Sequence, residues 1–345
     1  YYKMGGGLMQ LVAMGAQDVF LTGNPQITFF KVVYRRHTNF SKEAIKQEFN
    51  GSSSRKTCTL SRNGDLVQEI YLHKAGATAA APVTQPTSVE VEIGGQRIDK
   101  HYGTWMSIYD ELFDTNKDLH TEILKEGFMP LRFWFNRNPG LALPLIALQY
   151  HEVKIIVEGG NATDLLVNYV YLDTDERRRF AQVSHEYLIE QVQHTGSESV
   201  KEGSQSITLT YNHPVKALFW SGLTDHTTTG VSAYTAKLQL NGHDRFSEQS
   251  NGYFTGVQPY ECGLRPVCAA GHTLTTASAG MYSFCLKPGE HQPSGSCNFS
   301  RIDNARLVIT TTKGTAAGAA MGAQTLNVFA LNYNVLRVMS GMGGL

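Results

Sequence analysis

The stretch "SVEVEIGGQRI", residues 88–98, decides the fold class of this chain because it joins a strand pattern to a tight turn. Val89, Val91 and Ile93 alternate with glutamates, so the three aliphatic side chains share one face of a β-strand. Two adjacent glycines follow, and glycine readily adopts the positive φ angles of a two-residue hairpin turn. The stretch predicts an antiparallel hairpin with one buried face.

The stretch "AKLQLNGHDRF", residues 236–246, predicts a second hairpin of the same kind. Ala236, Leu238 and Leu240 alternate with polar residues, and the Asn-Gly pair that follows is the preferred sequence of a type I′ turn. It lies about 150 residues after the first hairpin, which is the spacing expected if the chain contains two copies of one structural unit.

Four further strand-like segments recur in the same order at a similar spacing. The pairs are "LVQEIYL" (66–72) with "PVKALFW" (214–220), "LRFWFN" (131–136) with "YSFCL" (282–286), "EVKIIV" (152–157) with "ARLVIT" (305–310), and "LLVNYVYL" (165–172) with "TLNVFALNYNVL" (325–336). Each copy consists of short strands joined by Gly, Pro and Asn turns, which is typical of an antiparallel sandwich. Eight strands per copy make a jelly roll.

We therefore expect an all-β chain of two tandem eight-stranded jelly-roll sandwiches, preceded by an N-terminal arm over residues 1–26. The first sandwich is expected over 27–194 and the second over 195–345. The polar, glycine-bearing stretch "HTGSESVKEGSQ", 194–205, is the expected linker.

One short helix interrupts the strand pattern. Its apolar stripe follows the i, i+3, i+4, i+7, i+8 spacing of Trp105, Ile108, Tyr109, Leu112 and Phe113. Asp110, Glu111 and Asp114 are expected on a solvated face, and the helix is expected across one end of the first sandwich. Adjacent helical residues point about 100° apart, so Asp110 and Glu111 are not predicted to act as an acid/base pair.

Composition excludes several classes of function. The 30 basic residues balance 30 acidic ones, so no net positive charge draws the chain to nucleic acid, and we expect no direct nucleic-acid contact. No apolar run is long enough to span a membrane, and the start lacks a signal-peptide pattern, which predicts a soluble protein made in a cytoplasm. We expect the five cysteines to be reduced thiols. The charge run "TDERRRF", 174–180, is interpreted as a solvated strand end or subunit contact rather than a nucleic-acid site.

The stretch richest in potentially reactive side chains is "EHQPSGSCNFSRIDN", residues 290–304. Its counterpart in the first copy, "RNPGLALPLIALQYH", shares proline and glycine but has neither serine nor cysteine. The common requirement is turn geometry, supplied here by Pro293 and Gly295. Neither His291 nor Cys297 lies in a recognised nucleophile motif, so we predict a structural loop and no enzyme.

Metal ligands are not arranged in a familiar pattern. The histidines are scattered, without H-x-H or H-E-x-x-H spacing, and a four-thiolate site from Cys262, Cys268, Cys285 and Cys297 would need unusually wide spacings. We predict no metal and no cofactor. Of the N-x-S/T sequons, Asn50 and Asn161 are weak candidates for glycosylation.

Four long blocks reaching from one end of the chain to the other carry a family resemblance. They are "GGGLMQLVAMGAQDVFLTGNPQITFFKVVYRRHTNFS" (5–41), "VEIGGQRIDKHYG" (91–103), "HQPSGSCNFSRIDNA" (291–305) and "NVFALNYNVLRVMSGMGGL" (327–345). They closely resemble the major capsid protein of nucleocytoplasmic large DNA viruses, a group that includes phycodnaviruses, mimivirus relatives and iridoviruses. The resemblance implies a structural late protein with a double jelly roll, which forms homotrimeric, pseudo-hexagonal capsomers.

These capsomers would tile the outer shell of an icosahedral virion assembled in the host cytoplasm. The implied partners are the chain itself, neighbouring capsomers, minor capsid and penton proteins and glycans, with the inner viral membrane reached only indirectly. The segment after "LVQEIYLHKAGA" and the stretches between later strands look short beside the family. The alternative function is a carbohydrate-binding or enzymatic β-sandwich protein.

Two groups of residues are assigned roles in such a capsomer. The arm is too apolar for a free tail, and we expect it on the inner side of the capsomer, with contacts from Leu8, Met9, Leu11, Val12 and Met14. The second group forms a structural loop whose polar groups satisfy turns and capsomer contacts: His291, Pro293, Gly295, Asn298, Arg301 and Asp303.

Overall fold

The computed structural model divides into two compact units, residues 1–39 and 40–345. It describes residues 5–51, 54–114, 117–223, 231–265, 279–313 and 324–345. The first unit contains α1 (Gly6–Val12) and α2 (Asp18–Thr22), and none of its described side chains is buried. The first strand begins at Phe40, so the segment 27–39, expected in the first sandwich, contributes no strand to it.

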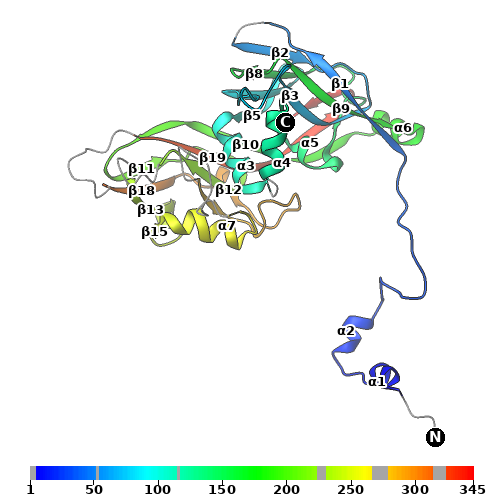
Figure 1. Ribbon diagram of the computed structural model, residues 1–345. Coiled ribbons are helices and arrows are strands. Elements are labelled where there is room, and N and C mark those ends of the chain that lie inside the picture. Colours follow the sequence, from blue (N-terminus) through cyan, green and yellow to red (C-terminus); the bar gives the residue numbers. More distant parts are fainter. Residues whose placement is uncertain (1–4, 52–53, 115–116, 224–230, 266–278, 314–323) are drawn as a thin grey trace. The chain divides into compact units, whose positions relative to one another are not determined.

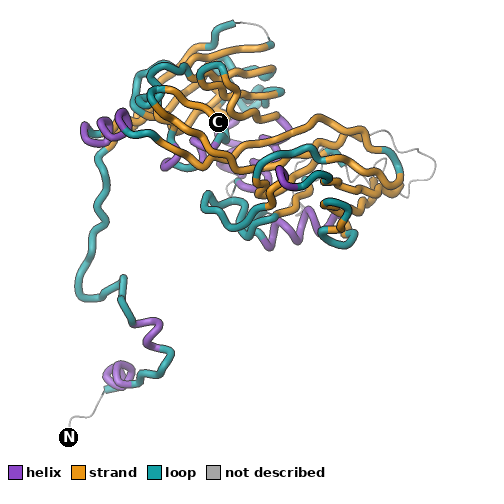
Figure 2. Tube along the Cα trace, turned by 180° about the vertical axis from the view of Figure 1, so that it is seen from behind, coloured by secondary structure: helices purple, strands orange, loops and turns teal. Residues whose placement is uncertain are grey.

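Residues 40–345 hold two groups of strands (Figures 1 and 2). In the first group, one sheet has the order β1-β9-β3-β6, with β7 also paired to β3. Its strands are β1 (Phe40–Glu48), β9 (Asp164–Leu172), β3 (Leu66–His73), β6 (Phe128–Pro130) and β7 (Leu143–Pro144). The other sheet has the order β2-β8-β4-β5. It consists of β2 (Arg55–Thr59), β8 (Val153–Glu158), β4 (Ser88–Ile93) and β5 (Gln96–Tyr102).

The second group repeats this plan. One sheet, ordered β10-β19-β12-β16, consists of β10 (His185–Val200), β19 (Gln324–Met339), β12 (Pro214–Ser221) and β16 (Gly280–Ser283), with β17 (Cys297–Asn298) and β20 (Met342–Gly344) at its margins. The other, ordered β11-β18-β13-β14, consists of β11 (Gly203–Thr208), β18 (Ala305–Lys313), β13 (Val231–Leu240) and β14 (His243–Asp244), with β15 (Gln249–Ser250) beside β13. Eight principal strands therefore occur twice in the same spatial order, which confirms the predicted double jelly roll.

Both predicted hairpins are present at the expected turns. Gly94 and Gly95 adopt φ angles of +58° and +86°, and Asn241 and Gly242 adopt +50° and +82°. These angles are the ones that a two-residue type I′ turn requires. The flanking strands pair as β4 with β5 and β13 with β14.

Each sandwich has its own apolar core. Val89, Val91 and Ile93 of β4 are fully buried against residues of the other sheet such as Val67 and Leu165. The second core forms in the same way around Leu218, Trp220, Leu238 and Leu307. Alternation along the strands thus produces two separate hydrophobic cores.

The predicted helix is present as α3 (Gly103–Phe113), and Met106 packs into the core of the first sandwich, but most of its apolar stripe contacts the second sandwich. Trp105, Ile108 and Leu112 pack against Ala217 and Phe219 of β12 in the second sandwich, where they form a third apolar cluster. The reason lies in β12, which is buried on both faces: one face fills the second core, and the outward face needs the helix as cover. In Figure 1, α3 lies between β5 and β12.

The expected solvated face of α3 is wrong for the same reason. Glu111 is buried, and only 19% of the Asp110 side chain is exposed. A helix enclosed by two sandwiches has little surface left for water, so sequence amphipathicity overestimated the exposure of its polar side chains.

Three further segments differ from expectation. The segment 131–136, expected as a strand, is not one: the short strand β6 ends at Pro130, and α5 (Trp134–Arg137) follows it. The charge run at 174–180 belongs to α6 (Thr174–Gln182), whose first backbone N–H is capped by Asp173. The expected linker 194–205 lies largely in β10 and β11, where side chains exposed on both faces leave no alternating pattern. The strands of the first group connect to those of the second through α6.

The remaining helical segments are short. They are α4 (Lys117–Lys125), α7 (Gln258–Glu261) and the turns η1 (Pro139–Leu141), η2 (Tyr253–Val257) and η3 (Phe299–Arg301). Within the described ranges, no helix has both the length and the apolar character needed to cross a bilayer.

Candidate functional site

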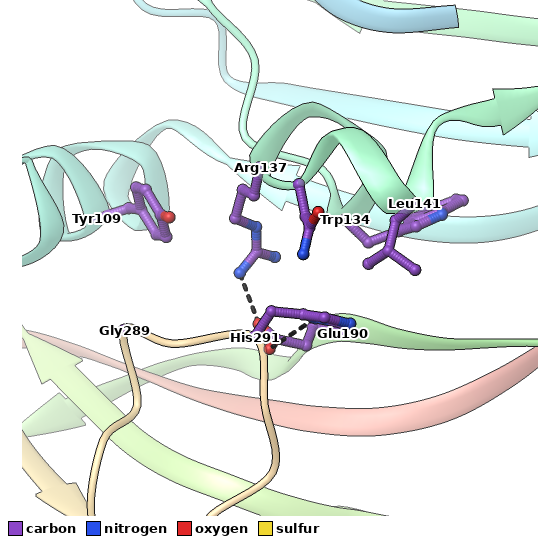
Figure 3. Close-up of a pocket in the computed structure, with 8 residues that line it drawn as sticks. Tyr109, Trp134, Arg137, Leu141, Glu190, Gly289 and His291 are labelled. Atoms are coloured by element: carbon purple, nitrogen blue, oxygen red, sulfur yellow. Dashed lines mark hydrogen bonds and ion pairs between the residues drawn. The ribbon is translucent and has the colours of Figure 1, made fainter. Parts of the chain in front are cut away.

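A polar junction lies between the two sandwiches, around a cavity of about 240 Å³. Figure 3 shows Arg137 and Trp134 of α5 and Tyr109 of α3 on one side of this cavity. Glu190 of β10 and the loop residues Gly289 and His291 lie on the other side. Segments that are distant in sequence therefore meet here, including the loop 290–304 with its potentially reactive side chains.

The centre of the junction is Glu190, whose carboxylate accepts hydrogen bonds from two cations. Arg137 Nη1 donates to Oε2 and Lys216 Nζ donates to Oε1, each over 2.7 Å. Only 7% of the Glu190 side chain and 1% of the Lys216 side chain are exposed. Charges this deeply buried are tolerated only when they are paired and hydrogen-bonded, so the three groups depend on one another.

A β-bulge explains how a lysine enters this apolar strand. The pairing of β12 with β19 shifts register between Val215 and Ala217, which places Lys216 at the irregularity. A bulge breaks the alternation of faces and re-aims a side chain. The equivalent strand β3 has its own shift between Val67 and Ile70. The bulge is thus part of the repeated plan, and the second copy uses it to carry a charge.

Local hydrogen bonds hold Arg137 in position. Asn136 Oδ1 accepts from the Phe133 backbone N–H at the start of α5, and Asn136 Nδ2 donates to the carbonyl of Gln68 in β3. Arg137 Nε donates to the Arg132 carbonyl over 2.8 Å. Burial by itself lowers the pKa of Arg137, but the Glu190 carboxylate and other neighbours raise it above its ordinary value. Arg137 therefore remains a guanidinium fixed toward β10.

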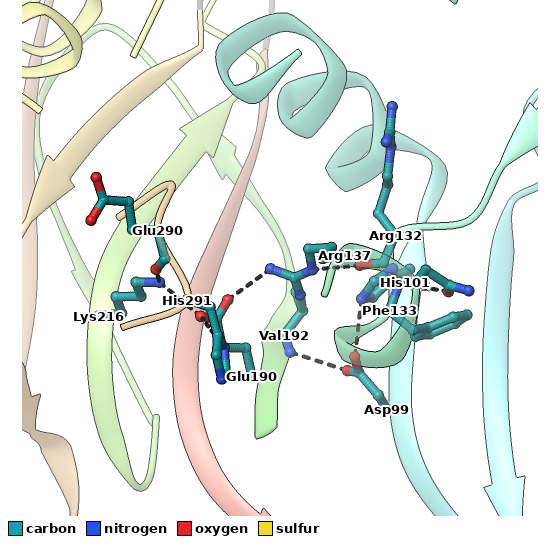
Figure 4. A network of polar contacts seen from close by, with 11 residues as sticks. Asp99, His101, Arg132, Phe133, Arg137, Glu190, Val192, Lys216, Glu290 and His291 are labelled. Atoms are coloured by element: carbon teal, nitrogen blue, oxygen red, sulfur yellow. Dashed lines mark hydrogen bonds and ion pairs between the residues drawn. The ribbon is translucent and has the colours of Figure 1, made fainter. Parts of the chain in front are cut away.

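The stretch 290–304 contributes a backbone group and an imidazole to this junction. The Glu290 carbonyl accepts from Lys216 Nζ over 2.7 Å, and His291 Nδ1 lies 4.0 Å from Glu190 Oε1 (Figure 4). Pro293 is exposed, whereas Gly295 is constrained: its φ is +142°, and a Cβ there would lie 2.7 Å from the Phe284 carbonyl. Glycine at 295 is thus required by both backbone angle and space.

The other predicted loop residues lie at the far end of the same stretch. Asn298 Oδ1 accepts from the Ser300 N–H and caps η3, while Arg301 and Asp303 are exposed. Cys297 pairs with Val215 where β17 joins β12, and burial raises the pKa of its thiol. Because thiolate is the reactive form and His291 faces Glu190 instead, this stretch does not assemble a nucleophile with its base.

The described cysteines give no geometry for the four-thiolate alternative, because one of its members falls on a segment outside the described residues. Cys58, Cys262 and Cys285 are buried free thiols, and Cys268 lies outside the described residues. The group of potential metal ligands that converges in the described part of the chain contains no cysteine. It consists of Asp110, Asp114 and His120.

This second polar cluster lies where α3 ends and α4 follows. Burial raises the pKa of Asp110 to about 7, against the opposing effect of the neighbouring Arg132 guanidinium. Asp110 and Asp114 lie one helical turn apart, and His120 lies six residues further along the chain. The sequence signal for this cluster is a D-x3-D pair at the end of a helix followed by a histidine, which the H-x-H and H-E-x-x-H spacings do not include.

The glycosylation candidates differ in their surroundings. Asn50 is exposed and forms an isolated bridge with Thr57. The amide of Asn161 is engaged at both ends, because Oδ1 accepts from the Thr84 N–H and Nδ2 donates to the Pro82 carbonyl over 3.1 Å. The side-chain nitrogen that would carry a glycan is therefore already occupied at Asn161.

The apolar side chains predicted for the arm are all at least half exposed. The exposed fractions are 50% for Leu8, 56% for Met9, 73% for Leu11, 63% for Val12 and 65% for Met14. Solvent-exposed apolar side chains in such density mark a contact surface.

Comparison with known proteins gives matches over nearly the whole chain. The family described as "Large eukaryotic DNA virus major capsid protein" matches residues 176–344, and "Major capsid protein N-terminus" matches residues 28–173. The major capsid protein of Pyramimonas orientalis virus is 51% identical, and that of Paramecium bursaria Chlorella virus 1 is 42% identical. In both cases 99% of each chain is covered. These alignments span 409 and 441 residues, more than the 345 of this chain, so both relatives have insertions that it lacks.

The solved structures agree with the sequence matches. A quasi-atomic model of the PBCV-1 virus capsid has a TM-score of 0.74 at 38% identity, over 92% of this chain and 99% of the other. The Faustovirus major capsid protein has a TM-score of 0.73 at 11% identity, with 94% of each chain covered, and so supports the fold alone.

Proposed function

The chain belongs to the major capsid protein family of large eukaryotic DNA viruses, and we propose that it is the subunit from which such a virus builds its outer icosahedral shell. Three copies associate into one pseudo-hexagonal capsomer. The observation that best supports this proposal is the repeat of one strand order in two sandwiches of the same chain. Three such chains around an axis present six similar sandwiches, so one gene product meets six neighbours in a hexagonal lattice.

The junction around Glu190 supports this role mechanically. A capsomer tiles only if its two sandwiches keep a constant relative orientation, and Arg137, Glu190 and Lys216 link α5 to the sheet of β10 and β12. Buried ion pairs specify geometry because any shift leaves a charge unpaired. The cluster is therefore assigned a structural role, and the alternative of a carbohydrate-binding or enzymatic sandwich is not favoured.

The arm is assigned to the inner side of the capsomer. Its exposed apolar side chains, Leu8 to Met14, need a protein surface to cover them in the particle. We assign that surface to minor capsid proteins or neighbouring capsomers. Penton proteins occupy the vertices, and the inner membrane is reached only through these partners.

The loop from His291 to Asp303 is assigned to folding rather than chemistry. Gly295 and Asn298 satisfy the turns, Pro293 stiffens the exposed part, and His291 completes the junction. The exposed Arg301 and Asp303 are assigned to capsomer contacts. Of the two glycosylation candidates, Asn50 is the better acceptor because its side chain is exposed. The virion is the proposed location, after synthesis and assembly in the host cytoplasm.

The decisive experiment measures the molar mass of the purified chain by size-exclusion chromatography with light scattering. A trimer has a mass of about 114 kDa, three times the 38.1 kDa chain, and negative-stain images should show particles with a hexagonal outline. A monomer at micromolar concentration, without such particles, overturns the proposal.

A further inference from the structure

A cluster of metal-ligand side chains lies at the C-terminal end of α3, outside the junction around Glu190. Asp110 lies in the last turn of α3, and Asp114, four residues further on, is its C-cap residue. His120, from α4, meets them so that ligand atoms of all three residues lie within 4.8 Å of one another. The exposed fractions of the side chains are 19%, 17% and 9%.

The second observation is a buried imidazole nitrogen without a hydrogen bond. Among the described residues, His120 Nε2 has no hydrogen-bond partner, although the atom is buried. His120 Nε2 is directed into the cluster, 3.6 Å from Asp110 Oδ2. A buried polar atom in this state costs free energy unless something binds it. Nε2 and a carboxylate oxygen therefore lie side by side, as two ligands of one cation do.

We propose that Asp110 and His120 bind a divalent transition-metal ion of the zinc class, with Asp114 orienting the imidazole. Zn–N and Zn–O bonds of roughly 2.0–2.1 Å place two ligand atoms of a tetrahedral site about 3.3 Å apart, close to the separation of Asp110 Oδ2 from His120 Nε2. Asp114 Oδ2 lies 3.3 Å from His120 Nδ1, which assigns it the role of orienting the ring. This carboxylate–imidazole arrangement leaves the Nε2 lone pair for the metal.

The charges of the cluster favour a cation. Arg132 Nη2 donates to Asp114 Oδ2 over 3.0 Å, and Arg132 Nε lies 3.5 Å from Asp110 Oδ1. One guanidinium thus faces two carboxylates, and it occupies the Oδ1 side of Asp110, while Oδ2 faces His120. The C-terminal end of α3 adds the negative end of a helix dipole, which also attracts cations. An imidazole nitrogen among the ligands selects zinc-class ions over Ca²⁺ and Mg²⁺, which prefer oxygen.

The site goes beyond the shell function and has a defined structural effect. A bound ion ties α4 to α3, and α3 covers the outward face of β12. Metal removal is therefore expected to loosen α4 from α3 without dissolving either core.

Equilibrium dialysis of the purified full chain against ZnCl₂, after stripping with EDTA, tests the proposal. We expect one zinc per chain by elemental analysis, and Co²⁺ in place of zinc should give the visible absorption of a bound, low-symmetry site. His120→Gln removes the Nε2 ligand and is expected to weaken zinc binding by more than tenfold, in the range seen when metal-site partners are lost. His243→Gln, an exposed histidine elsewhere, is the matched control and should bind as the wild type does.

Absence of stoichiometric zinc and cobalt binding in the wild type overturns the inference by itself, whatever the variants do. It is also overturned if His120→Gln, shown folded by circular dichroism, binds zinc as tightly as the control. If His120→Gln does not fold, Asp110→Asn replaces it, with the same expected loss. Because the readout is metal content, the result is independent of whether the chain forms trimers.

Discussion

Lys216 Nζ and Glu190 Oε1 lie 2.7 Å apart in the interior of this protein, and the lysine stands at a bulge in the most buried strand of the second sandwich. The same carboxylate binds Arg137 from the first half of the chain. A single acidic side chain thus holds together residues that are 53 and 26 positions away from it in sequence. This relationship links the fold to the proposed shell function, because it fixes one sandwich relative to the other.

Removing the lysine charge tests that link. Lys216→Met leaves Glu190 partly unpaired in a buried site, and we expect the free energy of unfolding to fall by about 3–5 kcal/mol. Denaturant unfolding followed by fluorescence measures the loss. Lys287→Met is the matched control, since Lys287 forms an exposed pair with Glu290 and should leave stability almost unchanged. Equal effects of the two substitutions would contradict the role given to Lys216.

Substitutions at neighbouring positions of the loop 290–304 should differ in their effect on folding and assembly. Gly295→Val forces a side chain against the Phe284 carbonyl at an unfavourable φ, and we expect a loss of at least about 2 kcal/mol together with poorer trimer formation. Cys297→Ser should preserve assembly. Pro293→Val should impair folding less than Gly295→Val, because Pro293 is exposed. Thermal unfolding and light scattering give both readouts, and Ser296→Val, also exposed, controls for added bulk.

If the arm contacts partners inside the shell, its loss should affect particle closure but not trimer formation. Deleting residues 1–20 removes about half of the first compact unit and leaves residues 40–345 intact, so trimers should still form. Closed particles should fail or become irregular, as judged by electron microscopy of an expression system that otherwise gives capsids. Replacing the five apolar side chains of the arm by serine is the milder variant and should reproduce the defect. Normal capsids from the deleted chain would refute the assignment of the arm.

Asp164 predicts an acid-sensitive contribution to stability. Burial alone raises its pKa, but hydrogen bonds from Thr163, His73 and Lys46 lower it below the ordinary value. A carboxylate with a lowered pKa in the folded state stabilises the fold above its unfolded pKa, and this stability is lost as the pH falls through the folded pKa. Asp164→Asn should therefore cost about 1–3 kcal/mol at pH 7, and the difference from the wild type should shrink below about pH 4.

The measurement is thermal unfolding of both proteins across this pH range. His73 Nδ1 lies 2.6 Å from Asp164 Oδ1, so the substitution also removes the closest partner of that imidazole. Asp303→Asn, an exposed carboxylate, should show no such pH-dependent difference. A constant gap between Asp164→Asn and the wild type at all pH values would mean that packing, and not charge, carries the effect.

Local patterns in the sequence were sufficient for most of the fold. Alternation at 88–98 and 236–246 predicted two hairpins, and the recurrence of strand segments predicted two sandwiches, because side-chain alternation and turn angles depend on near neighbours. For the loop 290–304, the absence of a nucleophile motif predicted a structural role, and Gly295 with its positive φ agrees with the predicted turn. The sequence shows a lysine within the apolar strand "PVKALFW", but it does not show which residue pairs with that lysine.

Tertiary structure decided what covers each face and which polar groups meet. The sequence of α3 specified an amphipathic helix, yet only the second apolar face of β12 determined where it packs and why Asp110 and Glu111 are buried. Likewise, Arg137, Glu190 and Lys216 come from three separate elements, and their convergence depends on sheet order and on a bulge. Periodicity acts over a few residues, whereas burial and charge pairing depend on contacts between segments distant in sequence, and no local pattern encodes these.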